Sequence, residues 1–143
     1  MSEPGLRSLG DDRWTLTLVR ALDHPPEKVW RAITEPRHLA RWYPMAAEHL
    51  DLRVGGAITF RDEEGTELPA EVTEVEPGRV FAFREFDVET GEHHLRLGLE
   101  ADGEGGCRLT LTHTFIGGDW AERTETGWLM CLDELERALA EGE

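Results

Sequence analysis

The chain has 143 residues, a length typical of one domain with a sizeable core. Thirty acidic side chains against fifteen basic ones give a formal net charge of −15. This charge argues against binding to nucleic acid or to a membrane surface, because both are held through Lys and Arg. No apolar run approaches the roughly 18 residues of a spanning helix. The first residues also lack a signal-peptide pattern, so we expect a cytoplasmic protein.

The N-terminal part of the chain predicts one strand followed by two short helices. Residues 1–12 are polar and predict a flexible end, before a single domain over residues 13–143. Residues 13–20 alternate between apolar and polar side chains, which predicts a half-buried strand. Pro26 and Pro36 each suit the first turn of a helix and predict two short helices after this strand.

The middle of the chain predicts strands joined by tight turns. Six segments alternate in hydrophobicity, namely residues 48–53, 57–62, 67–75, 80–86, 94–100 and 108–116. The third of them is less regular, because Val75 is out of phase with Ala70 and Val72. Consecutive strands joined by tight turns pair as antiparallel neighbours. Their polar side chains gather on one face, so we expect a sheet with one face toward solvent.

The C-terminal part carries the longest helical pattern. Apolar or small residues recur there at steps of three or four, namely Ala121, Thr124, Trp128, Leu132, Leu135 and Leu139. Trp120, Cys131 and Ala138 widen this face. One apolar face needs one partner surface, and the sheet is the only large one. We therefore predict an α+β fold in which a curved antiparallel sheet of about seven strands wraps around a long C-terminal helix.

One ordered set of motifs extends over nearly the whole chain from residue 13. It consists of PEKVWRAITEPRHLARWY over residues 26–43, Val54-Gly55-Gly56, Leu109-Thr110-Leu111-Thr112-His113, Gly127-Trp128 and Cys131-Leu132-Asp133-Glu134-Leu135. This set resembles the activator-of-Hsp90-ATPase homologue (AHSA1-like) family of the START/Bet v 1-like, or SRPBCC, superfamily. The resemblance implies the helix-grip fold, which often encloses a cavity. It also implies uses that range from carriers of hydrophobic ligands to polyketide cyclases and a domain of Hsp90 co-chaperones.

The first functional hypothesis is an interior ligand site. Its candidates are inward-facing apolar side chains and one histidine, namely Trp30, Trp42, Phe60, Phe81, Phe83, Leu97, Leu111, His113 and Trp128. Small-molecule sites combine apolar walls with a few polar groups. The same aromatic residues equally suit ordinary core packing. We predict a non-enzymatic domain, with a role in stress or metabolism, that binds a small apolar molecule of unknown identity.

His113 is the polar residue that bears most on this hypothesis. It shares a strand face with Leu111, so its imidazole could orient a ligand or transfer protons. Alternatively it is a buried histidine paired with another protein group. Asp62 could act as a base near the cavity rim, although an exposed turn residue is the favoured interpretation. We expect Tyr43 and His38 at the surface.

Two other functions stay open at this point. One is an enzyme of the cyclase or hydrolase type, with His113 as its acid or base. The other, by family analogy alone, is a chaperone-interaction domain. Met130 lies opposite the apolar face of the last helix and is compatible with a homodimer.

The sequence carries no motif for a cofactor or a metal. No phosphate loop, dinucleotide fingerprint or zinc signature is present. His93 and His94 are adjacent in a strand, so they point to opposite faces and cannot bind one metal together. Cys107 and Cys131 are expected to be free thiols.

Overall fold

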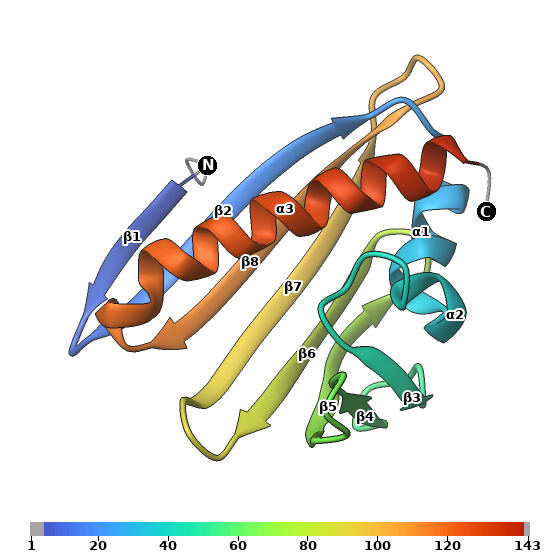
Figure 1. The fold of residues 1–143 in the computed structure, drawn as a ribbon. Helices are drawn as coiled ribbons and strands as arrows, with labels where there is room; N and C mark the ends of the chain where they lie inside the picture. Colours follow the sequence, from blue (N-terminus) through green and yellow to red (C-terminus); the bar gives the residue numbers. More distant parts are fainter. Residues whose placement is uncertain (1–4, 142–143) are drawn as a thin grey trace.

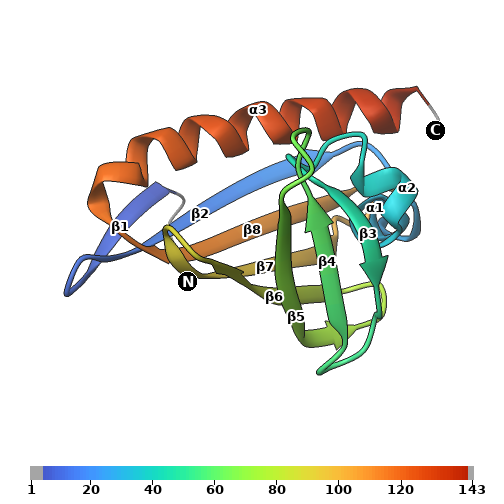
Figure 2. The same ribbon diagram turned by 60° about the horizontal axis from the view of Figure 1, so that its bottom comes forward.

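A computed structural model describes residues 5–141 of the chain. One antiparallel sheet of eight strands, in the order β1-β2-β8-β7-β6-β5-β4-β3, wraps around a long helix (Figures 1 and 2). The strands are β1 (Gly5–Gly10), β2 (Arg13–Leu22), β3 (Ala46–Leu50), β4 (Ala57–Arg61), β5 (Glu67–Glu76), β6 (Val80–Asp87), β7 (Gly91–Ala101) and β8 (Cys107–Ile116). The helices are α1 (Pro26–Thr34), α2 (Pro36–Leu39), the short η1 (Gly118–Trp120) and α3 (Ala121–Ala140). This arrangement confirms the predicted helix-grip α+β fold.

The sheet is completed by pairing between an N-terminal and a C-terminal strand. β2 lies beside β8, with Leu16 opposite His113 and Leu18 opposite Leu111. All other neighbours follow one another in the chain, as tight turns require. Figure 2 shows β3, β4 and β5 turned away from the plane of β2 and β8, so the sheet forms a curved wall around α3.

The β1 strand is a difference from the sequence analysis. We expected residues 1–12 to form a flexible end, but residues 5–10 pair with β2, with Leu6 opposite Leu16. Leu6 packs against the core, which gives this short edge strand an apolar anchor. Residues 1–4 lie outside the described part of the chain.

A β-bulge in β5 explains the irregular alternation of that segment. Val72 pairs with Phe83, but the next register position joins Glu74 to Ala82. The extra residue at the shift returns Val75 to a place opposite Phe81. A bulge bends its strand and increases its twist, so it contributes to the curvature of the sheet at this point.

The long helix α3 buries one face against the sheet, as predicted. Its buried residues are Ala121, Trp128, Leu132, Leu135, Ala138 and Leu139. Trp120 does not widen this face, because it belongs to η1 and is 43% exposed. At the other end Lys28 Nζ donates a hydrogen bond of 2.8 Å to the carbonyl oxygen of Leu139. The side chain thus caps the C-terminus of the helix, where a cation is favourable.

Candidate functional site

The inward face of the sheet carries three polar residues among apolar ones. Glu85 on β6 pairs with His93 on β7, and His113 on β8 pairs with Leu95 on β7. Glu85 and His113 are each 7% exposed, and His93 is half-buried. Buried polar groups are stable only when they are hydrogen-bonded, so their partners define what this face can do.

Aromatic rings fill the space between this face and α3. Tyr43 stacks on Phe60, with ring centroids 5.0 Å apart, and its ring also lies 5.6 Å from that of Trp128. Phe83 lies 5.6 Å from Phe60 and 5.1 Å from Phe81. Separations of this size are those of rings in direct contact. The aromatic side chains therefore pack on one another and leave little room between them.

Tyr43 and Glu85 form a buried polar pair inside this aromatic cluster. Tyr43 Oη donates a hydrogen bond of 2.5 Å to Glu85 Oε2. Burial raises the pKa of Glu85 to about 7, because the ionised form loses its hydration. The bond from Tyr43 opposes this shift and the nearby Asp87 carboxyl adds to it. The pair places a carboxyl group that titrates near neutral pH within an apolar interior.

His113 is held between α3 and β7 by two hydrogen bonds. Trp128 Nε1–H donates to His113 Nδ1 at 2.9 Å, and His113 Nε2 lies 2.9 Å from His93 Nδ1. An indole N–H can only donate, so Nδ1 of His113 carries no proton. The neutral ring then has its proton on Nε2 and donates it toward His93. Both nitrogens of His113 are thus used within the protein.

The same logic extends the chain of hydrogen bonds to the β6–β7 turn. His93 accepts at Nδ1, so its Nε2–H donates to Thr90 Oγ1 at 2.6 Å. The Thr90 hydroxyl bonds the carboxylate of Asp87, which also accepts the backbone N–H groups of Glu89 and Thr90. These bonds outweigh the effect of burial and lower the pKa of Asp87. Every donor in the series therefore points the same way, from α3 toward Asp87.

Burial favours the neutral form of both histidines in this series of hydrogen bonds. It lowers the pKa of His113 to about 3, with further lowering from the His93 and His94 imidazoles. Burial also lowers the pKa of His93, although the Asp87 carboxylate acts in the opposite direction. A proton on His113 Nδ1 would meet the N–H of Trp128, which is consistent with this shift.

The structure brings together most of the candidate residues predicted from sequence. Those that are buried in one core cluster are Trp42, Phe60, Phe81, Phe83, Leu97, Leu111 and Trp128. His113 is buried beside them and Trp30 is partly buried against the same cluster. Their common burial is required for an interior ligand site, but it is equally what ordinary core packing produces.

Two expectations about polar residues were wrong. Tyr43 is not exposed beside the short helices but is 6% exposed inside the aromatic cluster. His38 is likewise buried, with Nε2 at 3.3 Å from Glu35 Oε1. Glu85 was missed as a candidate although it continues the inward alternation of Phe81 and Phe83. That alternation was the signal that could have found it.

Two hollows lie at the edges of the packed interior, one beside Trp42 and one behind Phe83. A cavity of about 10 Å³, the space of one water molecule, lies where α1 and α2 meet the end of α3, beside Trp42 and Leu139. A shallow, open hollow of about 250 Å³ lies on the outer face of β5 to β8, beside Arg96 and Thr112. Because the rings of Tyr43, Phe60 and Trp128 are in contact, a ligand between the sheet and α3 would have to displace side chains that now occupy this space.

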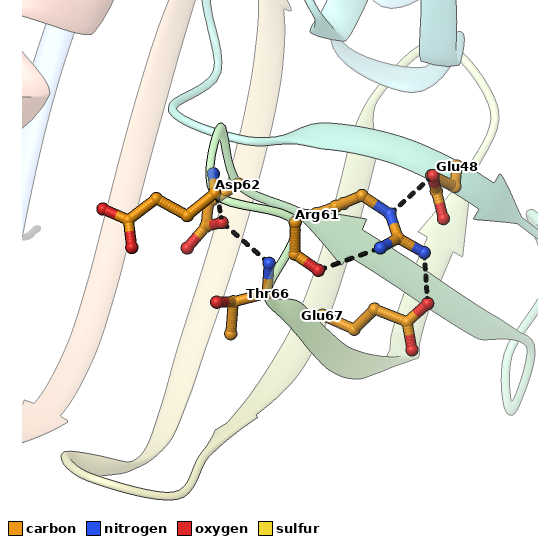
Figure 3. Close-up of polar contacts among 7 residues, drawn as sticks. Glu48, Arg61, Asp62, Thr66 and Glu67 are labelled. Carbon is orange, nitrogen blue, oxygen red and sulfur yellow. Dashed lines mark hydrogen bonds and ion pairs between the residues drawn. The ribbon is translucent and has the colours of Figure 1, made fainter.

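Asp62 closes a turn and does not face the core. Figure 3 shows the turn between β4 and β5, where Asp62 Oδ1 accepts the N–H of Thr66 at 2.9 Å. Beside it, Arg61 bonds Glu48 on β3 and Glu67 on β5, and thereby ties three strands together. The hydrogen bond from Arg61 lowers the pKa of Glu48. This cluster is a structural clamp on the edge of the sheet.

The described residues, 5–141, contain neither a metal-binding group of side chains nor a membrane-spanning helix. Within this range, no three His, Cys, Asp or Glu side chains are grouped so that they could bind a metal ion. The helices of the same range include none that is both long and apolar enough to cross a bilayer. Cys107 and Cys131 are free thiols, as expected.

Solved structures of other proteins share this fold. CalU16 from Micromonospora echinospora is 24% identical over 94% of this chain and 82% of its own, with a TM-score of 0.78. Protein MLL2253 from Mesorhizobium loti is 23% identical over 90% of this chain and 98% of its own, with a TM-score of 0.80. DynU16, of the dynemicin biosynthetic locus, is 26% identical with a TM-score of 0.79. That match covers 93% of this chain but only 49% of DynU16.

Sequence comparison assigns the family. Among proteins with curated functions, none matches this chain significantly. A sequence profile of the family described as "Activator of Hsp90 ATPase homolog 1-like protein" matches residues 23–140. Because this match covers most of the chain, the protein belongs to that family.

Proposed function

We propose that this domain binds a small, mostly apolar molecule between the inward face of the sheet and α3. The observation that carries the proposal is the Glu85 carboxyl, buried among aromatic rings with Tyr43 as its hydrogen-bonding partner. Burying such a group costs stability, and folded proteins keep features of this kind mainly at functional sites. Apolar walls with a few polar groups are the usual composition of a small-molecule site.

In this proposal Glu85, rather than His113, orients the ligand. Both nitrogens of His113 are bonded to Trp128 and His93, so a ligand could use them only by breaking those bonds. Glu85 accepts one hydrogen bond through Oε2, and a carboxyl group has room for several. In this proposal Trp42, Phe60, Phe81, Phe83 and Trp128 supply the apolar walls and Glu85 fixes the orientation.

A thermal-shift screen against apolar and amphipathic small molecules tests the proposal. A ligand at about 100 times its dissociation constant adds roughly 2.7 kcal/mol to the free energy of unfolding. For a domain of this size, that should raise the melting temperature by several degrees. Saturable increases of this kind support the site, and a flat response to a broad panel would count against it.

A pair of variants locates any ligand that is found. Leu111→Trp adds bulk to the centre of the inward face, and Thr112→Trp adds the same bulk to the opposite face of the same strand. Ligand binding should be lost in the first variant and kept in the second, provided that both remain folded by circular dichroism. If neither variant loses ligand binding, the ligand binds elsewhere on the protein.

Proton transfer inside the same site is a second candidate function. The specific observation in its favour is the pKa of Glu85 near 7, since a general acid or base works best when its pKa lies near the operating pH. Glu85, rather than His113, would be the reacting group. Incubation of the protein with its ligand, followed by mass spectrometry, separates the two functions. A binding protein returns the ligand unchanged, whereas an enzyme converts it and loses this activity in Glu85→Gln.

A further inference from the structure

The side chain of Tyr43 occupies the middle of the aromatic cluster in the manner of a bound molecule. Its ring stacks on Phe60 with an angle of 25° between the ring planes, and Trp42 meets it edge-on. Its hydroxyl donates to the carboxyl of Glu85. A phenol is thus held between aromatic walls, with a carboxyl oxygen as the acceptor for its hydroxyl.

Tyr43 differs from Phe60, Phe83 and Trp128 in the way its backbone is held. Phe60 and Phe83 are part of the sheet, and Trp128 lies within α3. Tyr43 lies between α2 and β3, outside both elements, and its N–H donates to the carbonyl oxygen of Leu39. Its side chain can therefore leave the cluster without breaking the sheet or the long helix.

We infer that Tyr43 stands in for the ligand, and that the natural ligand is a phenol: an aromatic molecule whose hydroxyl replaces that of Tyr43 on Glu85. The inference rests on the proposed function and names the class of molecule that the same site would take. The space that Tyr43 vacates has the shape of a flat ring, and its polar end is an acceptor. The site thus selects a ring with one donor at its edge.

Charge argues against ligands that carry an anionic group. A ligand with a carboxylate or phosphate would face Glu85, with Asp87 close enough to act on the same carboxyl. It would also approach a protein with a formal net charge of −15. A purely apolar ring would leave the Glu85 carboxyl without the partner that Tyr43 now gives it, which is unfavourable. A neutral phenol avoids both costs.

Fluorine NMR gives a direct test, because Tyr43 is the only tyrosine of the chain. Protein labelled with 3-fluorotyrosine will show one resonance, which reports whether this ring is buried or in solvent. Titration with 2-naphthol should move it toward the position of free fluorotyrosine. 2-Naphthol should bind about tenfold or more tightly than naphthalene, which lacks the hydroxyl.

Variants of Tyr43 and Glu85 test whether the Tyr43 ring competes with the ligand or forms part of the wall of its site. Tyr43→Ala removes the competing ring, so 2-naphthol should bind about tenfold or more tightly than to the wild type. If the alanine variant does not fold, Tyr43→Phe serves in its place. It removes only the hydroxyl and should also make 2-naphthol bind more tightly than to the wild type. Glu85→Leu should abolish the preference for 2-naphthol over naphthalene.

The outcomes are distinct from those that test the proposed function. The inference is overturned if 2-naphthol binds without moving the Tyr43 resonance, or if removal of the Tyr43 side chain weakens binding. It is also overturned if 2-naphthol fails to bind while another class of molecule does, in which case the proposed function stands. If no molecule of any class binds, the proposed function fails and the inference fails with it.

Discussion

Glu85 has surroundings that differ strongly from those that its side chain prefers in water. Burial raises its pKa from 4.5 to about 7 in the folded protein. The folded state therefore binds the proton of this carboxyl more tightly than the unfolded chain does. The stabilising contribution of this group is complete below pH 4.5, and it is lost as the pH rises to about 7.

Replacement of Glu85 by Gln should remove this pH dependence. The free energy of unfolding of Glu85→Gln, relative to the wild type, should rise between pH 4.5 and pH 7 by up to roughly 3 kcal/mol. Urea denaturation at several pH values measures this difference. Glu100→Gln is a matched control that removes the same kind of carboxyl from an exposed position, and it separates loss of charge from loss of the buried group. A difference for Glu85→Gln that does not vary with pH would contradict the raised pKa of Glu85.

The tautomer of His113 gives a second prediction for single residues. Trp128→Phe removes the donor to Nδ1, so this nitrogen becomes free to bind a proton. The pKa of His113 should then rise above about 3 while burial still holds it below its usual value, as measured by nitrogen NMR of the imidazole rings. Trp120→Phe, at an exposed indole, should leave the titration unchanged. A wild-type His113 that titrates near pH 6.5 would contradict the series of hydrogen bonds.

Some of these residues could be read from the sequence and others could not. The alternation of β8 placed His113 on the inward face, and the structure confirms that position. The alternation of Phe81 and Phe83 indicated Glu85 equally well. The burial of Tyr43 depends on a partner 42 residues away in the chain. No local pattern reports such a contact.

The cap on α3 leads to a prediction at the scale of elements. Lys28 joins α1 to the last turn of the helix through the carbonyl oxygen of Leu139. Lys28→Met should destabilise the protein by about 0.5–1 kcal/mol, because it removes a hydrogen bond and a favourable charge at the helix C-terminus. Amide exchange in the last turn of α3 should also become faster.

A control for this prediction lies on the neighbouring helix. Arg37 of α2 has a side chain that is 80% exposed, and within residues 5–141 its one ion pair is a long contact of 3.9 Å with Glu35. Arg37→Met removes the same charge and should leave both stability and exchange nearly unchanged. Equal effects of the two substitutions would mean that general charge, and not the cap, stabilises the helix end.

Elements with a strong hydrophobic period were predicted well. The strand β1, which has no such period and is held by pairing with β2, was not. The face of α3 follows from its spacing of three and four residues, and the two proline-started helices follow from their first turns. The strand β1 has glycine at both ends and exposed side chains over most of its length, so its own sequence does not indicate a strand. It forms because β2 offers an unpaired edge.

At the scale of the whole molecule, the fold positions the site but does not decide its use. The curved sheet and α3 face one another across side chains that are mostly aromatic. The polar groups at this boundary come from β6, β7, β8 and the turn before β3. A site assembled from four distant segments could be anticipated as a space from the fold class, but the hydrogen bonds among its polar residues required the structure.

The central claim is that small molecules bind between the sheet and α3, and the indole signals of the protein test it directly. A ligand from the thermal-shift screen would be titrated while a proton–nitrogen NMR spectrum records the indole N–H groups. Trp42 and Trp128 have buried indoles that donate to Ala32 and His113, whereas Trp120 is exposed. The signals of Trp42 and Trp128 should shift saturably while that of Trp120 stays in place. Shifts confined to Trp120, or no shift at saturating ligand, would contradict the claim.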